Sequence, residues 1–498
     1  MTHDATDDRK RWLALYVLCA GVLMIVLDMT IVNVALPSIK EDLGFSQSDL
    51  AWTVNAYLIA FGGLLLLAGR LGDLIGQRRV FLTGLAIFTV ASLLCAVAQT
   101  QELLIGARFV QGVGGALTAA VVLGMIVTMF PEPHEQAKAM GVYAFVASAG
   151  GSIGLLAGGV LTEAINWHWI FFINLPVGVV TALLTLRLVE SRDGLGLSHG
   201  ADIPGAALLT AGLMLGVYTI LEFGEQGAAT TQVVLLGIVA VGLLAGFLVR
   251  QARHHTPLMP LRLFRSRNVS GANAVVSLVV VGMFGMFFMG ALYLQQILGY
   301  DPLQVGLAFL PATVAMGAMS IGVSQRLNMR FGPRATLVPS LLLVAAGLLL
   351  FTQTPVDGAY VVDIMPALVL MGLGGGLAFP SVMTLAMSGA TAEDSGLASG
   401  VVNTSTQVGA AIGLAVLATL SSGRTEDMLA DGASTAAALN SGFHLAYLVG
   451  AGLVVAAVLL AAGVLRTEAP LAASHGEPDM SQAPDPTPPA EPAYSEGL

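Results

Sequence analysis

The chain has 498 residues, of which 56% are hydrophobic and only 10% are charged, and its mean hydropathy is +0.82. Because an ordinary soluble domain has about 25% charged residues, this composition excludes a soluble globular protein. The formal net charge of −10 does not set orientation in a membrane, which depends on Lys and Arg in short loops. Cys19 and Cys95 both lie within apolar segments, which excludes a disulfide framework.

Apolar segments long enough to cross a bilayer recur along the whole chain. We therefore predict an all-α integral membrane protein with fourteen transmembrane helices. The first segment is too long for a cleavable signal peptide and contains Asp28. The predicted spans are residues 12–36, 50–69, 80–98, 106–129, 139–161, 169–188, 203–222, 233–250, 269–297, 304–323, 336–353, 363–387, 397–420 and 442–465.

The basic residues favour one orientation. Of the 21 Lys and Arg residues, all except Lys40, Arg108 and Arg424 fall on one side of the membrane under the fourteen-span count. Since Lys and Arg accumulate in cytoplasmic loops, both termini are predicted to be cytoplasmic. Arg greatly outnumbers Lys, and Ala and Gly are abundant, which suggests a high-GC bacterium and therefore its cytoplasmic (inner) membrane.

The spans group as six, two and six. A weak echo of the loop after the second span, Arg326–Arg334, follows the tenth span, as two parallel six-helix repeats would require. The predicted parts are a cytoplasmic N-tail (1–11), an N-terminal six-helix bundle (12–190), two extra central helices (203–250), a basic cytoplasmic linker (251–267), a C-terminal six-helix bundle (268–465) and a Pro-rich disordered tail (467–498).

Two interpretations of the linker at 251–267 are open. Its basic residues are compatible with an interfacial amphipathic helix that is attracted to anionic lipid. They are equally compatible with a solvated loop that follows the orientation rule. We interpret His254 and His255 as loop residues and expect no metal site.

Two charged residues, Asp28 and Arg108, are not accounted for by the ends of predicted spans. An ionised side chain within a bilayer costs about 2.5–3.5 kcal/mol on the lenient scale, and Arg108 does not deprotonate. At 1.5 Å per residue Asp28 lies roughly 13 Å from the outer end of its span. Arg108 lies roughly 8 Å from the outer end of the fourth span when that span starts about three residues earlier, within the ~2–4 residues by which a predicted boundary varies. The similar depths favour mutual pairing or shared access to one cavity, and a purely structural ion pair is the alternative. Glu222, at the outer end of the seventh span, is a weaker candidate whose alternative is an exposed loop acid.

Glycine is concentrated in three places. A short charged loop, Gly69–Arg79, joins the second and third spans and forms a fixed joint on one membrane face. Leu104–Ala116 in the fourth span and Gly150–Gly159 in the fifth contain small residues that let helices approach closely.

These stretches resemble the major facilitator superfamily and, within it, the fourteen-span branch of drug:proton antiporters, over residues 12–465. The chain departs from the family pattern at three positions. Leu155 replaces a usual proline, and His168 and Thr406 stand where arginine is usual or frequent. The matching stretches are Leu27–Pro37, Gly69–Arg79, Leu104–Ala116, Gly150–Gly159 and Trp167–Gly178.

The resemblance implies a 6+2+6 major-facilitator architecture and a role for each motif. Asp28 would carry the proton, with Arg108 as its partner and Glu222 as a second candidate. Asp73 would interact with the positive N-terminal end of the thirteenth span, near Ser395–Gly396. The gating loop contributes Gly69, Arg70, Asp73, Gly76, Arg78 and Arg79, whose arginines would also anchor to lipid phosphate. The antiporter motif contributes Gly150, Gly154, Gly158 and Gly159. The expected substrate-cavity residues are Asn33, Asn55, Tyr57, Gln111, Asn403 and Gln407.

The sequence therefore predicts a proton-coupled antiporter that exports drugs, antibiotics or a self-made metabolite. The alternatives are a dedicated exporter of one peptide, siderophore or lipid-like substrate, and a transport-inactive membrane sensor. No phosphate-binding GxxxxGK[ST] loop and no His/Cys metal cluster occurs in the sequence, so we expect no enzyme activity, nucleotide, nucleic acid, metal or cofactor. The expected partners are a small-molecule substrate and a bilayer with anionic lipids, and a monomer is expected.

Overall fold

The described part of the chain is entirely helical. The structure, a computed structural model, describes residues 2–46, 49–130, 132–191, 194, 196, 202–226, 230–255, 257–259, 261–388 and 395–465. Within these ranges every regular element is a helix, as predicted. The tail at 467–498, predicted to be disordered, lies outside the described residues.

Helices follow one another with short connections. The first half contains α1 (Thr2–Leu43), η1 (Asp49–Ala51), α2 (Trp52–Ile75), α3 (Gln77–Ala96), α4 (Gln101–Met129), α5 (Pro133–Ala164), α6 (Trp169–Phe172) and α7 (Asn174–Leu188). Two further helices follow, α8 (Ile203–Gln226) and α9 (Thr231–Arg253). The second half contains η3 (Leu261–Arg265), α10 (Arg267–Leu292), η4 (Tyr293–Ile297), α11 (Pro302–Ala318), η5 (Met319–Val323), α12 (Ser324–Phe331), α13 (Pro333–Phe351), η6 (Tyr360–Ile364), α14 (Met365–Ser388), α15 (Ser395–Ala430) and α16 (Thr435–Gly463).

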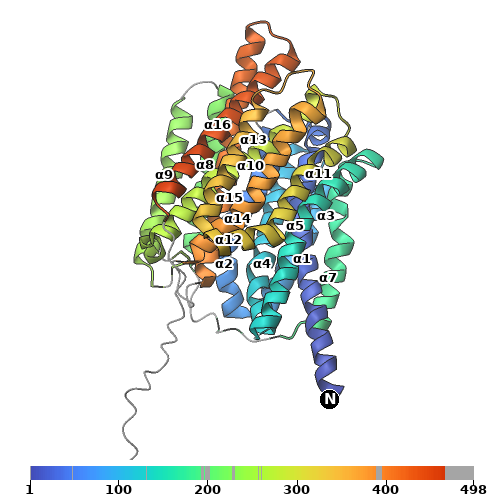
Figure 1. Ribbon diagram of the computed structural model, residues 1–498, viewed down its shortest axis with the longest axis vertical. Coiled ribbons are helices and arrows are strands. Elements are labelled where there is room, and N and C mark those ends of the chain that lie inside the picture. The colour runs from blue at the N-terminus through green and yellow to red at the C-terminus, as the bar shows by residue number, and fades with distance from the viewer. Residues whose placement is uncertain are drawn as a thin grey trace, which may run out of the picture. The chain divides into compact units, whose positions relative to one another are not determined.

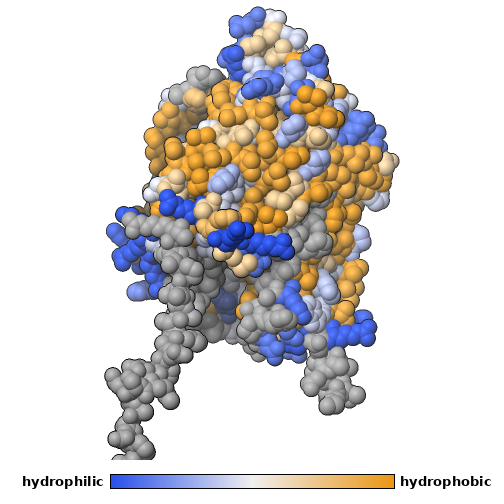
Figure 2. Space-filling view, viewed as in Figure 1, coloured by the Kyte–Doolittle hydropathy of each residue, from blue (hydrophilic) through white to orange (hydrophobic). Residues whose placement is uncertain are grey.

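Each of the fourteen predicted spans overlaps a helix. Among the described residues, 12 helices are long and apolar enough to cross a membrane. The fifth and tenth spans correspond to the shorter apolar helices Ile153–Ala164, within α5, and Pro302–Ala318. A band of hydrophobic residues covers the face shown in Figure 2, with hydrophilic residues gathered on both sides of it. The chain is a multi-pass membrane protein, and the count of fourteen stays a prediction.

Two helix pairs make the most extensive contacts between the halves. The long helices run side by side (Figure 1), and α5 packs against both α1 and α11, whereas α2 packs against both α4 and α15. The additional helix α8 packs against α2 and α15, and α9 packs against α8. Helix α8 therefore covers the α2–α15 contact, with α9 on its other side.

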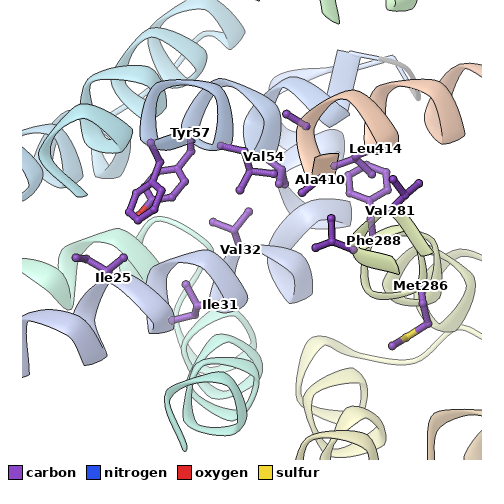
Figure 3. Packing of buried hydrophobic residues seen from close by; sticks show 14 of the residues in the cluster. Ile25, Ile31, Val32, Val54, Tyr57, Val281, Met286, Phe288, Ala410 and Leu414 are labelled. Carbon is purple, nitrogen blue, oxygen red and sulfur yellow. The ribbon is translucent and has the colours of Figure 1, made fainter. Parts of the chain in front are cut away.

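The core continues across the contact between the halves. Figure 3 shows Val32 of α1 and Val54 of α2 near Phe288 of α10 and Ala410 and Leu414 of α15, and all five are buried. Lipid tails are as apolar as these side chains, so close packing rather than water exclusion holds the helices together.

The helix at the N-terminus is longer than the predicted first span. α1 begins at Thr2 and runs through the predicted tail, because neither Gly nor Pro interrupts the chain before Gly21. The predicted sixth span corresponds to the apolar segment Trp169–Leu188. Its helical hydrogen bonding is interrupted between α6 and α7, because Pro176 has no N–H to donate to the carbonyl of Phe172.

The described linker residues are closer to the loop than to an amphipathic helix. Residues 251–253 belong to α9 and Arg267 to α10, and between them the described residues form no helix longer than the five residues of η3. The side chains of Arg262 and Arg265 are exposed, whereas two leucines are buried. Leu258 is buried against Leu66 of α2 and Ala206 of α8. Leu263 is buried against Val401 of α15. The linker packs between helices because these leucines find protein partners there.

A buried carboxylate fixes α8 to α9. Oδ1 of Asp202 accepts hydrogen bonds from Gly205 N (2.9 Å) and from Arg250 Nε (2.5 Å), and Oδ2 accepts one from Gln251 Nε2 (2.8 Å). The oxygen of Gln251 accepts from the N–H of Met259 in the linker (3.0 Å). Burial raises the pKa of Asp202, but the hydrogen bonds from Arg250, Gly205 and Gln251 outweigh it, and the pKa lies below its ordinary value.

The same glycine joint occurs in both halves. Gly76 separates α2 from α3 with φ 99° and ψ 129°, and Gly332 separates α12 from α13 with φ 86° and ψ 153°. Residues other than glycine rarely adopt such positive φ values, because their Cβ atom clashes with the backbone. The matched geometry supports the internal repeat inferred from the Arg326–Arg334 echo.

The glycines of the antiporter motif lie where α5 meets its two neighbours. Gly150, Gly154 and Gly158, four residues apart, face α1 around residues 23–31. Gly159 faces Pro302 and Leu303 at the start of α11. The motif therefore lets α5 approach both α1 in its own half and α11 in the other half.

We predict that Gly154→Ala will destabilise the protein, because the new Cβ would lie 2.9 Å from the Leu27 carbonyl oxygen and would clash with Thr30 Oγ1. Overpacking of this kind costs about 1–3 kcal/mol, measurable as a lower midpoint of thermal unfolding in detergent. Gly151→Ala is the matched control, since nothing lies within 4 Å of its added Cβ. Equal midpoints for the two variants would contradict the close approach of α5 to α1.

Candidate functional site

Asp28 and Arg108 form a buried ion pair. Asp28 of α1 is 0% exposed and Arg108 of α4 is 1% exposed. The Arg108 Nη1 atom lies 2.5 Å from Asp28 Oδ2. The structure thus brings together the two charges that the sequence placed at similar depth.

The other carboxylate oxygen is also satisfied. Asp28 Oδ1 accepts hydrogen bonds from Gln111 Nε2 (2.7 Å) and Asn174 Nδ2 (3.0 Å). An ionised carboxylate only accepts hydrogen bonds, and here it has three donors from α4 and α7. The site is therefore built for the charged form of Asp28.

The guanidinium is held on several sides. Arg108 Nε donates to the Thr53 carbonyl oxygen of α2 (2.9 Å), and Nη1 also donates to Gln111 Oε1 (2.6 Å). The guanidinium carbon lies 4.5 Å from the ring centre of Tyr57 and 5.7 Å from that of Phe171. Such cation–π contacts gain strength where water is excluded.

A second layer comes from α3. Ser92 Oγ accepts from Gln111 Nε2 (2.8 Å) and from Asn174 Nδ2 (3.4 Å). The Cys95 thiol lies 3.7 Å from Gln111 Oε1. Residues from α1, α2, α3, α4 and α7 therefore meet in one buried network, which we call the Asp28 network. A buried ion pair offsets its desolvation only with such additional hydrogen bonds.

Sequence reasoning missed three members of this network. Thr53 contributes only its backbone carbonyl, which no side-chain pattern indicates. Ser92 and Asn174 are polar residues inside predicted spans, and this polarity could have indicated that they take part in a buried polar site. Asn174 reaches Asp28 because α7 starts at this residue after the break from α6.

The expected substrate-cavity residues divide into two groups. Gln111 belongs to the Asp28 network, and Asn33 donates to the Met29 carbonyl of its own helix (3.2 Å). Within the described residues, Asn55, Tyr57 OH and Gln407 Oε1 are buried polar groups without a hydrogen-bond partner. Asn403 is half-buried on α15.

Unpartnered polar groups gather near the α2–α15 contact. A Cβ added at Gly62 of α2 would lie 2.6 Å from Gln407 Cβ of α15, and one added at Gly63 would lie 2.5 Å from Thr210 Oγ1 of α8. Thr210 Oγ1 and Thr404 Oγ1 also lack partners among the described residues. Buried donors and acceptors without partners suit a site that a polar ligand or water fills.

The gating loop lies at the face that holds the N-terminus. Asp73 is exposed and, with Gly76 and Arg78, lines a cavity of about 580 Å³. The Arg78 Nη2 atom donates to the Leu186 carbonyl of α7 (2.6 Å). Gly69 has open space around it, Arg70 is half-buried and Arg79 is exposed. The contact predicted between Asp73 and Ser395–Gly396 stays a prediction, because residues 389–394 and the side chains at 395–399 lie outside the described part.

Glu222 is half-buried near the end of α8. None of the described hydrogen bonds of the Asp28 network comes from α8, so the structure does not bring the two acids together. Within the described ranges, no group of three or more His, Cys, Asp or Glu side chains could hold a metal ion.

The three departures from the family pattern all fit their surroundings. Leu155 is buried in α5, which runs unbroken over Pro133–Ala164, and its carbonyl lies against Gly306 of α11. The His168 ring stacks on Trp167 at 3.7 Å. Thr406 Oγ1 donates to the Val402 carbonyl of its own helix (2.8 Å).

A profile of the Major Facilitator Superfamily matches residues 18–414. The chain belongs to the major facilitator superfamily. It is 40% identical to the puromycin resistance protein pur8 of Streptomyces alboniger over 91% of this chain and 90% of that protein. It is 37% identical to the cephamycin export protein CmcT of Amycolatopsis lactamdurans over 84% of this chain and 87% of that protein.

A solved structure shares the fold. A bacterial homologue of the human lysosomal transporter Spinster, in an inward-facing and unoccupied conformation, superposes with a TM-score of 0.65 at 14% identity. The match covers 91% of this chain and 96% of that one. The major-facilitator fold expected from the sequence motifs is therefore confirmed.

We predict strong energetic coupling between Asp28 and Arg108. Each of Asp28→Asn and Arg108→Met leaves one buried charge uncompensated and should cost about 3–5 kcal/mol of stability. The double variant removes both charges and should be more stable than the sum of the single effects by about 1–3 kcal/mol. Thermal unfolding of all four proteins in the same detergent measures the cycle. Additive effects would show that the two charges do not interact.

Proposed function

We propose that this protein is a proton-coupled antiporter that exports small organic compounds, such as antibiotics, across the inner membrane of a bacterium. The observation that carries the proposal is the buried Asp28–Arg108 pair, in a chain whose relatives are named for antibiotic resistance and export. We propose a monomeric transporter without enzymatic activity or cofactor, driven by the proton gradient.

The proposed topology has fourteen spans in a 6+2+6 arrangement, with both termini in the cytoplasm. The domain boundaries are those of the sequence prediction, with the N-terminal bundle extended to the start of α1. The distribution of Lys and Arg supports this orientation. Under it, the face that holds Arg78 and Arg187 is cytoplasmic.

The chemistry of coupling follows from the network. Arg108, Gln111 and Asn174 donate to three of the roughly four lone-pair positions of the Asp28 carboxylate, and the adjacent positive charge of Arg108 favours its ionised form. We propose that the pair separates before an external proton binds to a carboxylate oxygen. When the pair re-forms with the cavity open to the cytoplasm, the proton leaves Asp28 and is released inside. A cationic substrate favours the ionised carboxylate, so substrate and proton compete for the same site.

Conformational change would be carried by α5 and the gating loop. The glycines of the antiporter motif let α5 slide between α1 and α11 while staying in close contact with both. We propose that Asp73 steadies the state closed to the cytoplasm by binding the N-terminal end of α15, where a carboxylate gains about 0.3–1 kcal/mol. Arg70, Arg78 and Arg79 complete this gate.

A narrow substrate range is the second candidate. The relatives described above are named for single compounds, puromycin and cephamycin, which favours a dedicated exporter over a multidrug one. Asn55, Tyr57, Gln407 and Asn403 are the proposed substrate contacts, since three of them present buried polar groups without partners among the described residues. Efflux is measured for a panel that includes puromycin, a cephamycin and a cationic dye. A dedicated exporter transports one of these compounds, whereas a multidrug exporter transports several.

We predict that Asp28→Asn will reduce the rate of efflux driven by a pH gradient in proteoliposomes at least tenfold, because the site can no longer exchange a proton. Puromycin is the first substrate to test. Glu41→Gln, an exposed acid on the same helix, is the matched control and should transport at the wild-type rate. Glu222→Gln should also remain active, since the described hydrogen bonds to Asp28 come from α4 and α7 and not from α8, which carries Glu222. A wild-type rate for Asp28→Asn would rule out this residue as the proton carrier.

A further inference from the structure

An apolar groove lies on the outer surface between α1 and α7. Its volume is about 740 Å³, and its walls include Leu13, Tyr16 and Val17 of α1 and Val177 and Val180 of α7. Tyr16 and Val180 are each 54% exposed. The two helices pack against each other, so the groove has a fixed floor.

A cationic cavity lies at the ends of the same helices. The cavity of about 580 Å³ that holds Asp73 is lined by four cations, Lys10, Arg11, Arg78 and Arg187. Its acidic lining residues are Asp73 and Glu190. Arg11 is paired with Glu135, whose Oε2 lies 3.5 Å from Arg11 Nη1. Lys10, Arg78 and Arg187 therefore exceed the two acids by one positive charge, which favours an anion over a neutral or cationic ligand.

The groove and the cavity are neighbours. Leu188 of α7 lines both. On α1, Lys10 and Ala14 line the cavity, and Leu13, Val17 and Ala20 line the groove. These positions follow one another at helical spacing along one side of α1. An apolar surface groove thus lies next to a cluster of cations, the arrangement that suits an amphiphile.

One charged donor in this cavity lacks an acceptor. The Arg78 Nε atom is buried and has no hydrogen-bond partner among the described residues, although Nη2 of the same side chain donates to Leu186. A buried charged donor without an acceptor is costly. An anionic oxygen in the cavity would remove that cost.

We propose that the groove and the neighbouring cavity together bind one anionic glycerophospholipid from the adjacent membrane leaflet. The phosphate lies among Lys10, Arg78 and Arg187, and an acyl chain fills the groove between α1 and α7. Because Gly72, Asp73 and Gly76 also line the cavity, the bound lipid links the gating loop to α1 and α7. The proposal does not depend on proton coupling or on the identity of the exported substrate.

The test uses the full chain in detergent, exposed to equal amounts of phosphatidylglycerol and phosphatidylcholine with identical acyl chains, and counts retained lipid by native mass spectrometry. We expect the wild-type protein to retain phosphatidylglycerol at least tenfold better. Lys10→Gln/Arg187→Gln should weaken its retention roughly 30-fold, since each cation near an anionic group contributes about fivefold. Arg9→Gln/Arg265→Gln removes two exposed cations that do not line the cavity and should bind like wild type.

A second pair of variants tests the groove independently. Val180→Trp should fill it and reduce lipid retention, whereas Val179→Trp, at an exposed neighbour outside the groove, should not. Inorganic phosphate and glycerol phosphate at millimolar concentration should fail to displace the lipid. Equal retention by the two charge-loss variants would overturn the site. Displacement by inorganic phosphate, together with an unaffected Val180→Trp, would show a free-anion site instead of a lipid site.

Discussion

A permanently charged guanidinium inside an apolar helical bundle is the constraint on which the rest of this structure depends. Arg108 does not lose its proton, so a buried anion and further acceptors must offset the cost of its burial. Asp28, Gln111 and the Thr53 carbonyl accept from its Nε and Nη1 atoms. Gln111, Asn174 and Ser92 extend the network to α7 and α3, so five helices of the first half meet at this point.

The same constraint underlies the proposed coupling. In that proposal a proton on Asp28 removes its attraction for Arg108. Helix α5 packs its glycines on α1 at residues next to Asp28 and on α11 in the other half. We propose that a change at the ion pair passes through α1 and α5 to the contact between the halves. The hydrogen bonds of Asp202 and the buried linker leucine Leu258 hold α8 and α9 against this region.

The helices could be predicted from the sequence, because apolar length depends only on residue spacing. Depth along the spans also indicated that Asp28 and Arg108 either pair or share one cavity, and the structure decides for the pair. The sequence was also sufficient for the glycine joint, whose positive φ recurs at Gly332. The sequence did not predict the roles of Asn174, Ser92 and the Thr53 carbonyl, because these roles depend on how each helix is rotated about its axis. The hydrogen bonds of Asp202 to α9 were not predicted for another reason: Arg250 and Gln251 are 48 and 49 residues away in the chain. Such contacts appear only when the helices are placed together.

The central claim is that a single exchangeable acid, Asp28, couples proton entry to export. With one proton per cycle, exchange for a monovalent cation moves no net charge across the membrane. The decisive measurement is efflux of a monovalent cationic substrate from proteoliposomes under a pH gradient alone and then under a voltage alone. A voltage of 100 mV supplies about 2.3 kcal/mol per elementary charge moved, enough to be detected clearly. The account predicts efflux driven by the pH gradient and almost none by voltage. Equal efflux under voltage alone would contradict it, because more than one proton would then move per cycle.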